Sequence, residues 1–294
     1  MTILGIHPGA LGDVVLFAQL LGALRNARGG PVRLAAGTEK AALLAGLGAI
    51  DEAVDFDGLP PAAASDGCDL LVSCLCPADP AERQRLAAAA GAAEAIFLPV
   101  RPPADFEGHI LDFWAKRAGV GAIPAPCWPV PDAWRDAARD ALSASGAGAD
   151  RPYVLIHPGS GGRDKNWPLD RFVALARLLK ADGRRARQTV FVVGPTELDW
   201  WGPGAVEELA REFPTIIAPP LATLAGLAAG AGAYLGNDSG PAHLAAGVGA
   251  PTVGLFRRAG AAHFAPRGRR VRILAGDDLT AIDVRTVAKA VENR

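Results

Sequence analysis

The chain has 294 residues, of which 50% are hydrophobic and 21% charged, and its formal net charge is −1 at pH 7. This length suits two domains, because single hydrophobic cores stop growing at roughly 250–300 residues. The sequence lacks both an apolar run of the roughly 18 residues that a membrane helix needs and the basic start of a secretory signal, so we expect a cytoplasmic protein.

In the first half, short apolar runs alternate with stretches rich in Ala and Leu. Strand-like runs cover residues 2–7, 32–36, 69–75 and 95–100, and helix-like stretches cover 12–26, 39–47, 81–91 and 107–117. This alternation predicts a parallel, doubly wound α/β sheet in an N-terminal domain of residues 1–145. A Pro-rich composition predicts a linker at about 119–152, with a short helix at 134–143 inside it.

The alternation restarts after the linker and predicts a second Rossmann-like domain over residues 151–294. Its strand-like runs are 153–157, 190–193, 215–218, 233–236, 251–256 and 271–274, and its helix-like stretches are 169–179, 205–212, 221–230, 241–248 and 281–292. Ligands of such sheets bind beyond the carboxyl ends of the strands, and two facing sheets would form a cleft there. We therefore expect the functional residues in the loops that lead from strands into helices.

Charge and cysteine content narrow the classes of ligand. Residues 1–149 contain 11 Lys and Arg against 17 Asp and Glu, whereas residues 150–294 contain 19 against 14. A basic second half suits a phosphate-bearing ligand, although most surface charges are simply solvated. The four cysteines form no CxxC pair and have no metal-ligand spacing, which predicts buried thiols and no metal site. We expect no nucleic-acid partner.

The first strand-to-helix loop has the sequence HPGALGDVV and places Asp13 in the first turn of a helix. A carboxylate in that position can simply cap the helix and interact with its dipole. Alternatively, an ionised Asp13 at the mouth of a cleft would serve as a general base toward an attacking hydroxyl.

The first loop of the second half, IHPGSGGRDKNWP, predicts a phosphate cradle. Ser160 and Gly161 offer a hydroxyl and an unobstructed backbone N–H, and Lys165 offers a cation. The glycine-lysine-hydroxyl order of a Walker A loop is absent. A surface turn is an equally good interpretation of this loop taken alone.

Two later loops supply the remaining candidates. Glu197 follows the strand at 190–193, where a carboxylate can bind a ribose diol or act as a helix N-terminal charge. In NDSGPAHLAAG, Asp238, Ser239 and Gly240 lie between a strand and a helix whose N-terminus would stabilise a diphosphate. His243 projects from the same first turn, where a structural hydrogen bond is the alternative role.

Taken together, GALGD, HPGSGGRDKNWP, VVGPTE and GNDSGPAHLAAGVGAPTVGLF resemble glycosyltransferase family 9, the family of ADP-heptose:lipopolysaccharide heptosyltransferases. The resemblance implies an α/β GT-B fold, in which two Rossmann-like domains have parallel sheets facing across a central cleft. It implies an inverting transfer without a metal or other cofactor. Asp13 matches the catalytic base of the family. Residues that match its donor contacts are Ser160, Lys165, Glu197, Asp238, Ser239 and Gly240.

The expected activity is transfer of a heptose from ADP-heptose to a hydroxyl of a lipopolysaccharide core or a related surface glycan. The expected partners are a nucleotide-sugar donor and a glycan or glycolipid acceptor, with at most peripheral contact with the inner membrane. Lys165 and Ser160 would stabilise the negative charge that develops on the leaving diphosphate, which makes Lys165 a catalytic candidate beside Asp13. Two alternatives are a non-catalytic nucleotide-sugar-binding module and a nucleotide-sugar epimerase of the same fold.

Overall fold

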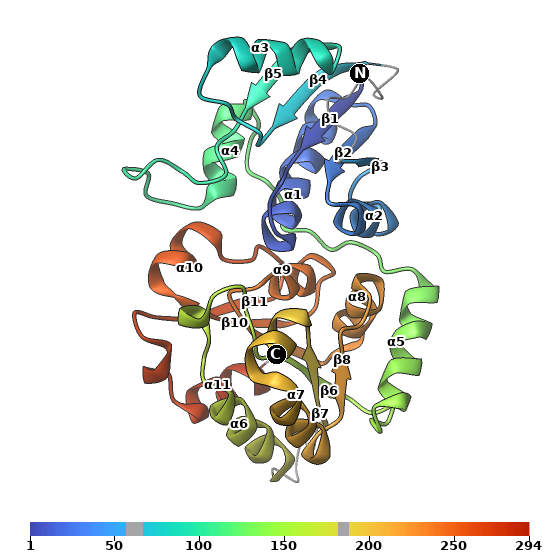
Figure 1. Ribbon diagram of the computed structural model, residues 1–294, viewed down its shortest axis with the longest axis vertical. Helices are drawn as coiled ribbons and strands as arrows, with labels where there is room; N and C mark the ends of the chain where they lie inside the picture. The colour runs from blue at the N-terminus through green and yellow to red at the C-terminus, as the bar shows by residue number, and fades with distance from the viewer. Residues whose placement is uncertain (57–66, 182–187, 294) are drawn as a thin grey trace. The chain divides into compact units, whose positions relative to one another are not determined.

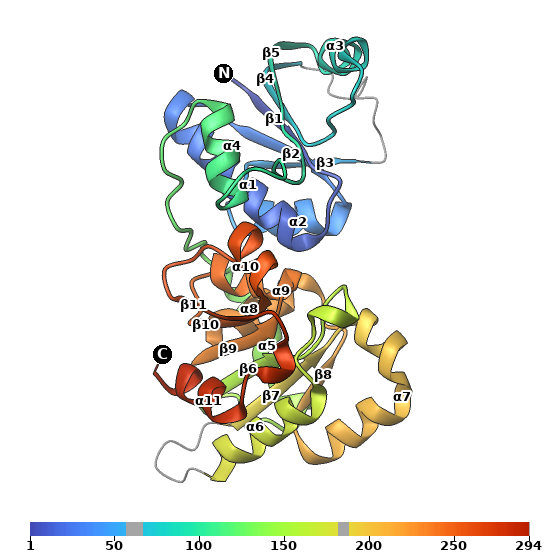
Figure 2. The same cartoon turned by 90° about the vertical axis from the view of Figure 1, so that its left-hand side faces the viewer.

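The computed structural model describes residues 1–56, 67–181 and 188–293, and the chain divides into two compact units. The first unit is Met1–Trp128 and the second is Pro129–Arg294. Each unit contains one parallel sheet that lies among helices, as Figure 1 and Figure 2 show. The α/β class with two Rossmann-like sheets, predicted from the alternating pattern, is confirmed.

The first unit contains five strands and four helices among its described residues. The strands are β1 (Ile3–Ile6), β2 (Val32–Ala36), β3 (Glu52–Asp55), β4 (Cys68–Ser73) and β5 (Ala92–Phe97). The helices are α1 (Leu11–Arg28), α2 (Thr38–Gly46), α3 (Pro80–Ala89) and α4 (Ile110–Ala118). All strand pairs are parallel, and the order across the sheet is β3-β2-β1-β4-β5.

The second unit has a six-stranded parallel sheet. Its strands are β6 (Tyr153–His157), β7 (Gln188–Val193), β8 (Thr215–Ile217), β9 (Ala233–Asn237), β10 (Thr252–Arg257) and β11 (Val271–Gly276). Its α-helices are α5 (Asp132–Ala144), α6 (Leu169–Ala181), α7 (Pro195–Glu212), α8 (Leu221–Gly230), α9 (Gly240–Gly247), α10 (Arg258–Phe264) and α11 (Val284–Glu292). Two single 3-10 turns are η1 (Arg163–Lys165) and η2 (Leu279–Ala281).

The second sheet is covered on both faces. Val154 and Ile156 of β6 join a buried cluster with apolar side chains of α6, α7 and α11. Tyr153 points to the opposite face, where its hydroxyl donates to the Leu227 carbonyl of α8 at 2.6 Å. Burial on both faces explains why the inner strands β6, β7, β9 and β10 have continuous apolar runs with little polar alternation.

The order of the second sheet is β11-β10-β9-β6-β7-β8, so both sheets have the strand order of a Rossmann fold. In each sheet the chain builds one side first and then returns to the middle to build the other. The direction changes between β1 and β4 in the first unit and between β6 and β9 in the second. Ligands of open parallel sheets bind at such switch points, beyond the carboxyl ends of the strands.

The structure differs from the predicted elements in several places, and the short helix α10 was not predicted. The strand β3 was not predicted, because it has four residues at the sheet edge and is mostly exposed. The helix α7 begins ten residues before the predicted one and has a kink at Gly202, whose φ of 72° is not helical. The boundary between the units falls after Trp128, so the helix α5 of the predicted linker belongs to the second unit, where it packs on α8.

Among the described residues, no helix is both long enough and apolar enough to cross a bilayer.

Candidate functional site

The helix α9 begins directly after β9, at the switch point of the second sheet. Ser239 is its N-cap residue and Gly240 its first residue, so the Gly240 backbone N–H and the positive dipole end of the helix lie at the carboxyl edge of the sheet. The predicted residues Asp238, Ser239 and Gly240 therefore occupy the place where a Rossmann sheet binds phosphate.

The structure brings the two predicted loops of this switch point together. Lys165 Nζ lies 3.0 Å from Asp238 Oδ2, and these residues are 73 positions apart in the sequence. The Lys165 side chain is 47% exposed and that of Asp238 is 14% exposed. The ammonium group of this ion pair is therefore open to solvent, whereas the carboxylate is mostly covered. A ligand phosphate can therefore reach the ammonium group without displacing packed side chains.

Asn237 joins the glycine-rich loop to β9 and was not among the predicted site residues. Its side chain is fully buried; Nδ2 donates to the Pro158 carbonyl at 2.7 Å, and Oδ1 accepts from the Trp167 backbone N–H at 3.0 Å. An amide that pairs with backbone on both sides holds the loop at a set distance from α9. The only sequence signal was an amide at the last position of an apolar strand.

Glu197 is buried at the start of α7, where its carboxylate contacts the backbone and a histidine. Its side chain is 2% exposed, and Oε2 accepts from the Gly194 backbone N–H at 2.7 Å in a capping box of α7. The same oxygen lies 3.6 Å from His157 Nε2. Burial lowers the pKa of His157, and the charge of Glu197 acts in the opposite direction. These contacts match the alternative role of a helix N-terminal charge, and ribose binding stays a prediction.

The remaining predicted donor residues differ in exposure: Ser160 and His243 are buried, and Gly161 is exposed. The Ser160 hydroxyl, 2% exposed, donates to the Gly162 carbonyl at 2.9 Å, so it closes the turn that carries Lys165. Gly161 is exposed at the tip of that turn. His243 lies in the first turn of α9 but is buried, with 4% of its surface exposed. Direct ligand contact therefore suits Gly161 better than His243.

Ser239 has a buried hydroxyl at this edge of the sheet. The Tyr234 hydroxyl lies beside it; burial raises the pKa of that phenol, and the Ser239 hydroxyl acts in the opposite direction. A ligand oxygen at the N-terminus of α9 would give the Ser239 hydroxyl a further partner.

In the first unit, Asp13 lies in the first turn of α1, beyond the carboxyl end of β1. A methyl group added at Gly9 would lie 3.0 Å from Asp13 Oδ2 and 2.6 Å from the His7 ring. Gly9 is therefore wedged between the two side chains. Cys74 follows β4 across the switch point, and burial, with smaller contributions from Cys76 and Asp13, raises the pKa of its thiol. Asp13 thus occupies the ligand-binding edge of the first sheet.

His7 supports the turn before Asp13 and is fully buried. Its Nδ1 accepts from the Gly9 backbone N–H at 3.0 Å, and its ring packs on Phe17 and Trp114 at centroid distances of 5.2 and 6.1 Å. Burial, with a smaller contribution from the charge of Lys40, lowers the pKa of His7 to about 4. The imidazole is therefore neutral at pH 7, as its acceptor role requires.

This shift predicts a loss of stability in acid. The unfolded chain takes up a proton at His7 below about pH 6.5, and the folded chain does so only near pH 4, so stability present above pH 6.5 falls as the pH decreases to 4. The expected loss is about 3 kcal/mol. Denaturant unfolding of the full chain at pH 7 and pH 4, compared with a His7→Gln variant, measures it. Equal acid sensitivity in the two proteins would contradict the assignment.

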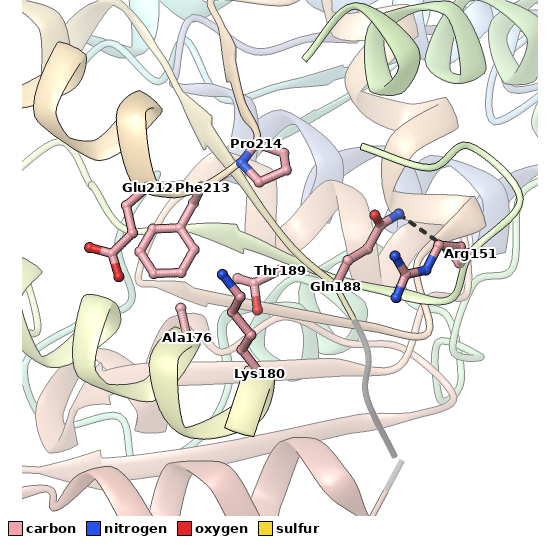
Figure 3. Close-up of a pocket in the computed structure, with 8 residues that line it drawn as sticks. All are labelled: Arg151, Ala176, Lys180, Gln188, Thr189, Glu212, Phe213 and Pro214. Atoms are coloured by element: carbon pink, nitrogen blue, oxygen red, sulfur yellow. Dashed lines mark hydrogen bonds between the residues drawn. The ribbon is translucent and has the colours of Figure 1, made fainter. Parts of the chain in front are cut away.

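A pocket of about 230 Å³ lies elsewhere in the second unit (Figure 3). Its lining includes Gln188 and Thr189 at the start of β7, Lys180 near the end of α6, and Phe213 between α7 and β8. It therefore opens at the amino ends of the strands, opposite to the edge that carries Lys165. We do not assign the ligand site to it.

The sequence model of glycosyltransferase family 9 (heptosyltransferase) matches residues 124–290, which is more than half of the chain. Lipopolysaccharide heptosyltransferase 3 of Escherichia coli is 33% identical over 135 residues, which span 43% of this chain and 36% of that protein. The chain thus matches little more than a third of the length of this curated relative.

Several solved structures have the same fold. A glycosyl transferase family 9 protein from Veillonella parvula DSM 2008 has a TM-score of 0.80 at 20% identity, covering 99% of this chain and 96% of its own. The E. coli ADP-heptose lps heptosyltransferase II has a TM-score of 0.79 at 16% identity, and the match covers 100% of this chain and 98% of that one. The E. coli heptosyltransferase WaaC with ADP has a TM-score of 0.69 at 16% identity, and the match covers 100% of this chain and 99% of that one. These likenesses confirm the predicted GT-B fold class.

Proposed function

The chain belongs to glycosyltransferase family 9, and we propose that it transfers a heptose from ADP-heptose to a hydroxyl of a lipopolysaccharide core or a related surface glycan. The observation that carries the proposal is the joining of Lys165 and Asp238 beside the N-terminus of α9, at the switch point of the second sheet. ADP as the nucleotide is supported by the fold relative described with bound ADP.

In this proposal the second unit binds the donor. The Gly240 backbone N–H at the start of α9 and the Ser239 hydroxyl bind the diphosphate, and Lys165 provides the positive charge. Negative charge grows on the diphosphate as the bond to the sugar breaks, so these groups act most strongly in the transition state. Charge stabilisation of this kind is the reason to propose a transfer that needs no metal ion.

The first unit supplies the base. Asp13 takes the proton from the acceptor hydroxyl as that oxygen forms a bond to the anomeric carbon, and the diphosphate leaves from the opposite face with the bonding electrons. Attack opposite to the leaving group inverts the anomeric configuration. The acceptor would be a glycolipid, so we also propose peripheral contact of this protein with the cytoplasmic face of the inner membrane.

Donor binding tests the proposal directly. In a thermal-shift screen of ADP-heptose and UDP-, GDP- and CDP-sugars, we expect ADP-heptose to stabilise the protein most, because a ligand of the native state raises the melting temperature according to its affinity. A Lys165→Met variant should bind ADP-heptose roughly 10–100-fold more weakly, since a charge-assisted hydrogen bond is worth about 1.5–3 kcal/mol. Calorimetry measures the difference.

Arg177→Met is the matched control for Lys165→Met. It removes one positive charge from the same unit, but Arg177 pairs with Glu212 at 2.7 Å on α6 and α7, away from the strand ends that bear Lys165. Its affinity for ADP-heptose should stay at the wild-type level. Absence of stabilisation by any of the four nucleotide sugars would overturn the proposed function.

A further inference from the structure

Lys40 makes a contact in the first unit that neither the sequence motifs nor the proposed reaction uses. It lies in the first turn of α2, and its Nζ donates to the backbone carbonyl of Gly9 at 2.6 Å, across 31 positions of sequence. A Cβ atom at Gly37 would lie 2.7 Å from Lys40 Cε, so the glycine before α2 gives the side chain room to fold back. The contact joins the turn after β2 to the turn after β1.

Lys40 occupies a position in which a lysine destabilises the helix, and its contact with Gly9 offsets that cost. A cation in the first turn of a helix opposes the helix dipole. Glu39, the acidic residue beside it, would suit the same helix end better. The Gly9 carbonyl is the partner that the structure provides for this half-buried ammonium group.

Gly9 is the part of the β1–α1 turn on which the surroundings of Asp13 depend. Its N–H donates to His7 Nδ1 at 3.0 Å while its carbonyl accepts from Lys40, so both sides of the residue are held. An added methyl group would come within 3.0 Å of Asp13 Oδ2. A rotation of the Gly9 peptide would therefore change the space around that carboxylate.

We infer that Lys40 is a positioning residue for Asp13: by binding the Gly9 carbonyl, it holds the β1–α1 turn in the conformation that presents the carboxylate to the acceptor hydroxyl. The inference rests on the proposed function, because it takes Asp13 as the base. A fixed base is required, since general-base catalysis depends on hydrogen-bond reach to the proton that is removed. The influence of Lys40 on the pKa of His7 agrees with its place at this turn.

The test compares Lys40→Met, Lys40→Arg and a Lys116→Met control in the full chain. Lys116 is the exposed lysine in the last turn of α4 and carries the same charge in the same unit. With ADP-heptose as donor and a lipopolysaccharide that lacks core heptose as acceptor, Lys40→Met should lower kcat by roughly 10–100-fold. The KM for ADP-heptose should stay within about twofold, Lys40→Arg should restore most of kcat, and Lys116→Met should behave as wild type.

Two further measurements do not depend on activity. In Lys40→Met, hydrogen–deuterium exchange of the peptide that spans the β1–α1 turn should become at least several-fold faster. The pKa of His7, measured by NMR, should rise only slightly above about 4, because burial, the larger cause of its low value, is unchanged. Unchanged kcat, or unchanged exchange of the turn, in Lys40→Met would overturn the inference. If the wild type transfers no sugar, the proposed function fails, whereas the exchange data still decide whether Lys40 holds the turn.

Discussion

Asp13→Asn is expected to reduce heptose transfer by about 10²–10⁴-fold, because a general base contributes a factor of that size and an amide cannot accept the proton. Asn has the same shape, so the packing of Gly9 against this side chain should persist. The donor affinity should stay unchanged, because the residues proposed to bind the diphosphate belong to the second unit. Steady-state kinetics and calorimetry with ADP-heptose measure the two quantities.

Asp112→Asn is the matched control for this variant. Asp112 is also an acidic residue in the first turn of a helix of the first unit, in α4, and it is exposed. Its replacement should leave kcat near the wild-type value. Turnover by Asp13→Asn within about threefold of wild type would reject Asp13 as the base. A wild type that binds ADP-heptose but transfers nothing would instead favour the non-catalytic binding module.

Gly159→Ala is expected to destabilise the second unit by about 3 kcal/mol and to weaken donor binding. A Cβ atom at Gly159 would lie 1.6 Å from Glu197 Oε1 and 2.2 Å from its Cδ, closer than any real contact. Glu197 cannot easily move away, because it is buried and accepts from the Gly194 N–H. Overpacking of this kind costs about 1–3 kcal/mol, and the lost capping bond adds to it.

The clash with Glu197 can be separated from other effects of the methyl group. Gly161→Ala adds the same methyl two residues further along, where the new atom would have no neighbour within 4 Å, so the free energy of unfolding should change by less than about 0.5 kcal/mol. Adding Glu197→Ala to Gly159→Ala should recover about 2 kcal/mol in a double-mutant cycle. Denaturant unfolding measures Gly161→Ala and the four proteins of the cycle, and additive effects would show that Glu197 is not the obstacle.

Much of the fold was predictable because its signals are local. All six strands of the second sheet were predicted from apolar runs. The signal was strongest for the four inner strands β6, β7, β9 and β10, because a parallel strand covered on both faces consists almost wholly of apolar residues. The edge strand β3 escaped because only one of its residues, Val54, is even half buried. The helix α5 was assigned to a linker because its Pro-rich flanks resemble one, and only its packing on α8 places it in the second unit.

The candidate site was predictable to a smaller extent. Sequence placed Lys165 and Asp238 beyond different strands, but their approach to 3.0 Å depends on β6 and β9 being neighbours in the sheet. For Glu197, the sequence indicated the position of the residue but not its contacts. Its place after a strand suggested ribose binding, whereas its contacts depend on how its rotamer fits under Gly159.

The sequence by itself determined the alternation of strands and helices, the two parallel sheets, and the strand ends that carry polar residues, because each of these depends on neighbours within a few positions. The tertiary structure decided which of those residues meet. Asn237 reaches Pro158 across 79 positions, and Lys40 reaches Gly9 across 31. Such contacts depend on strand order, register and side-chain rotamers, which no local pattern specifies.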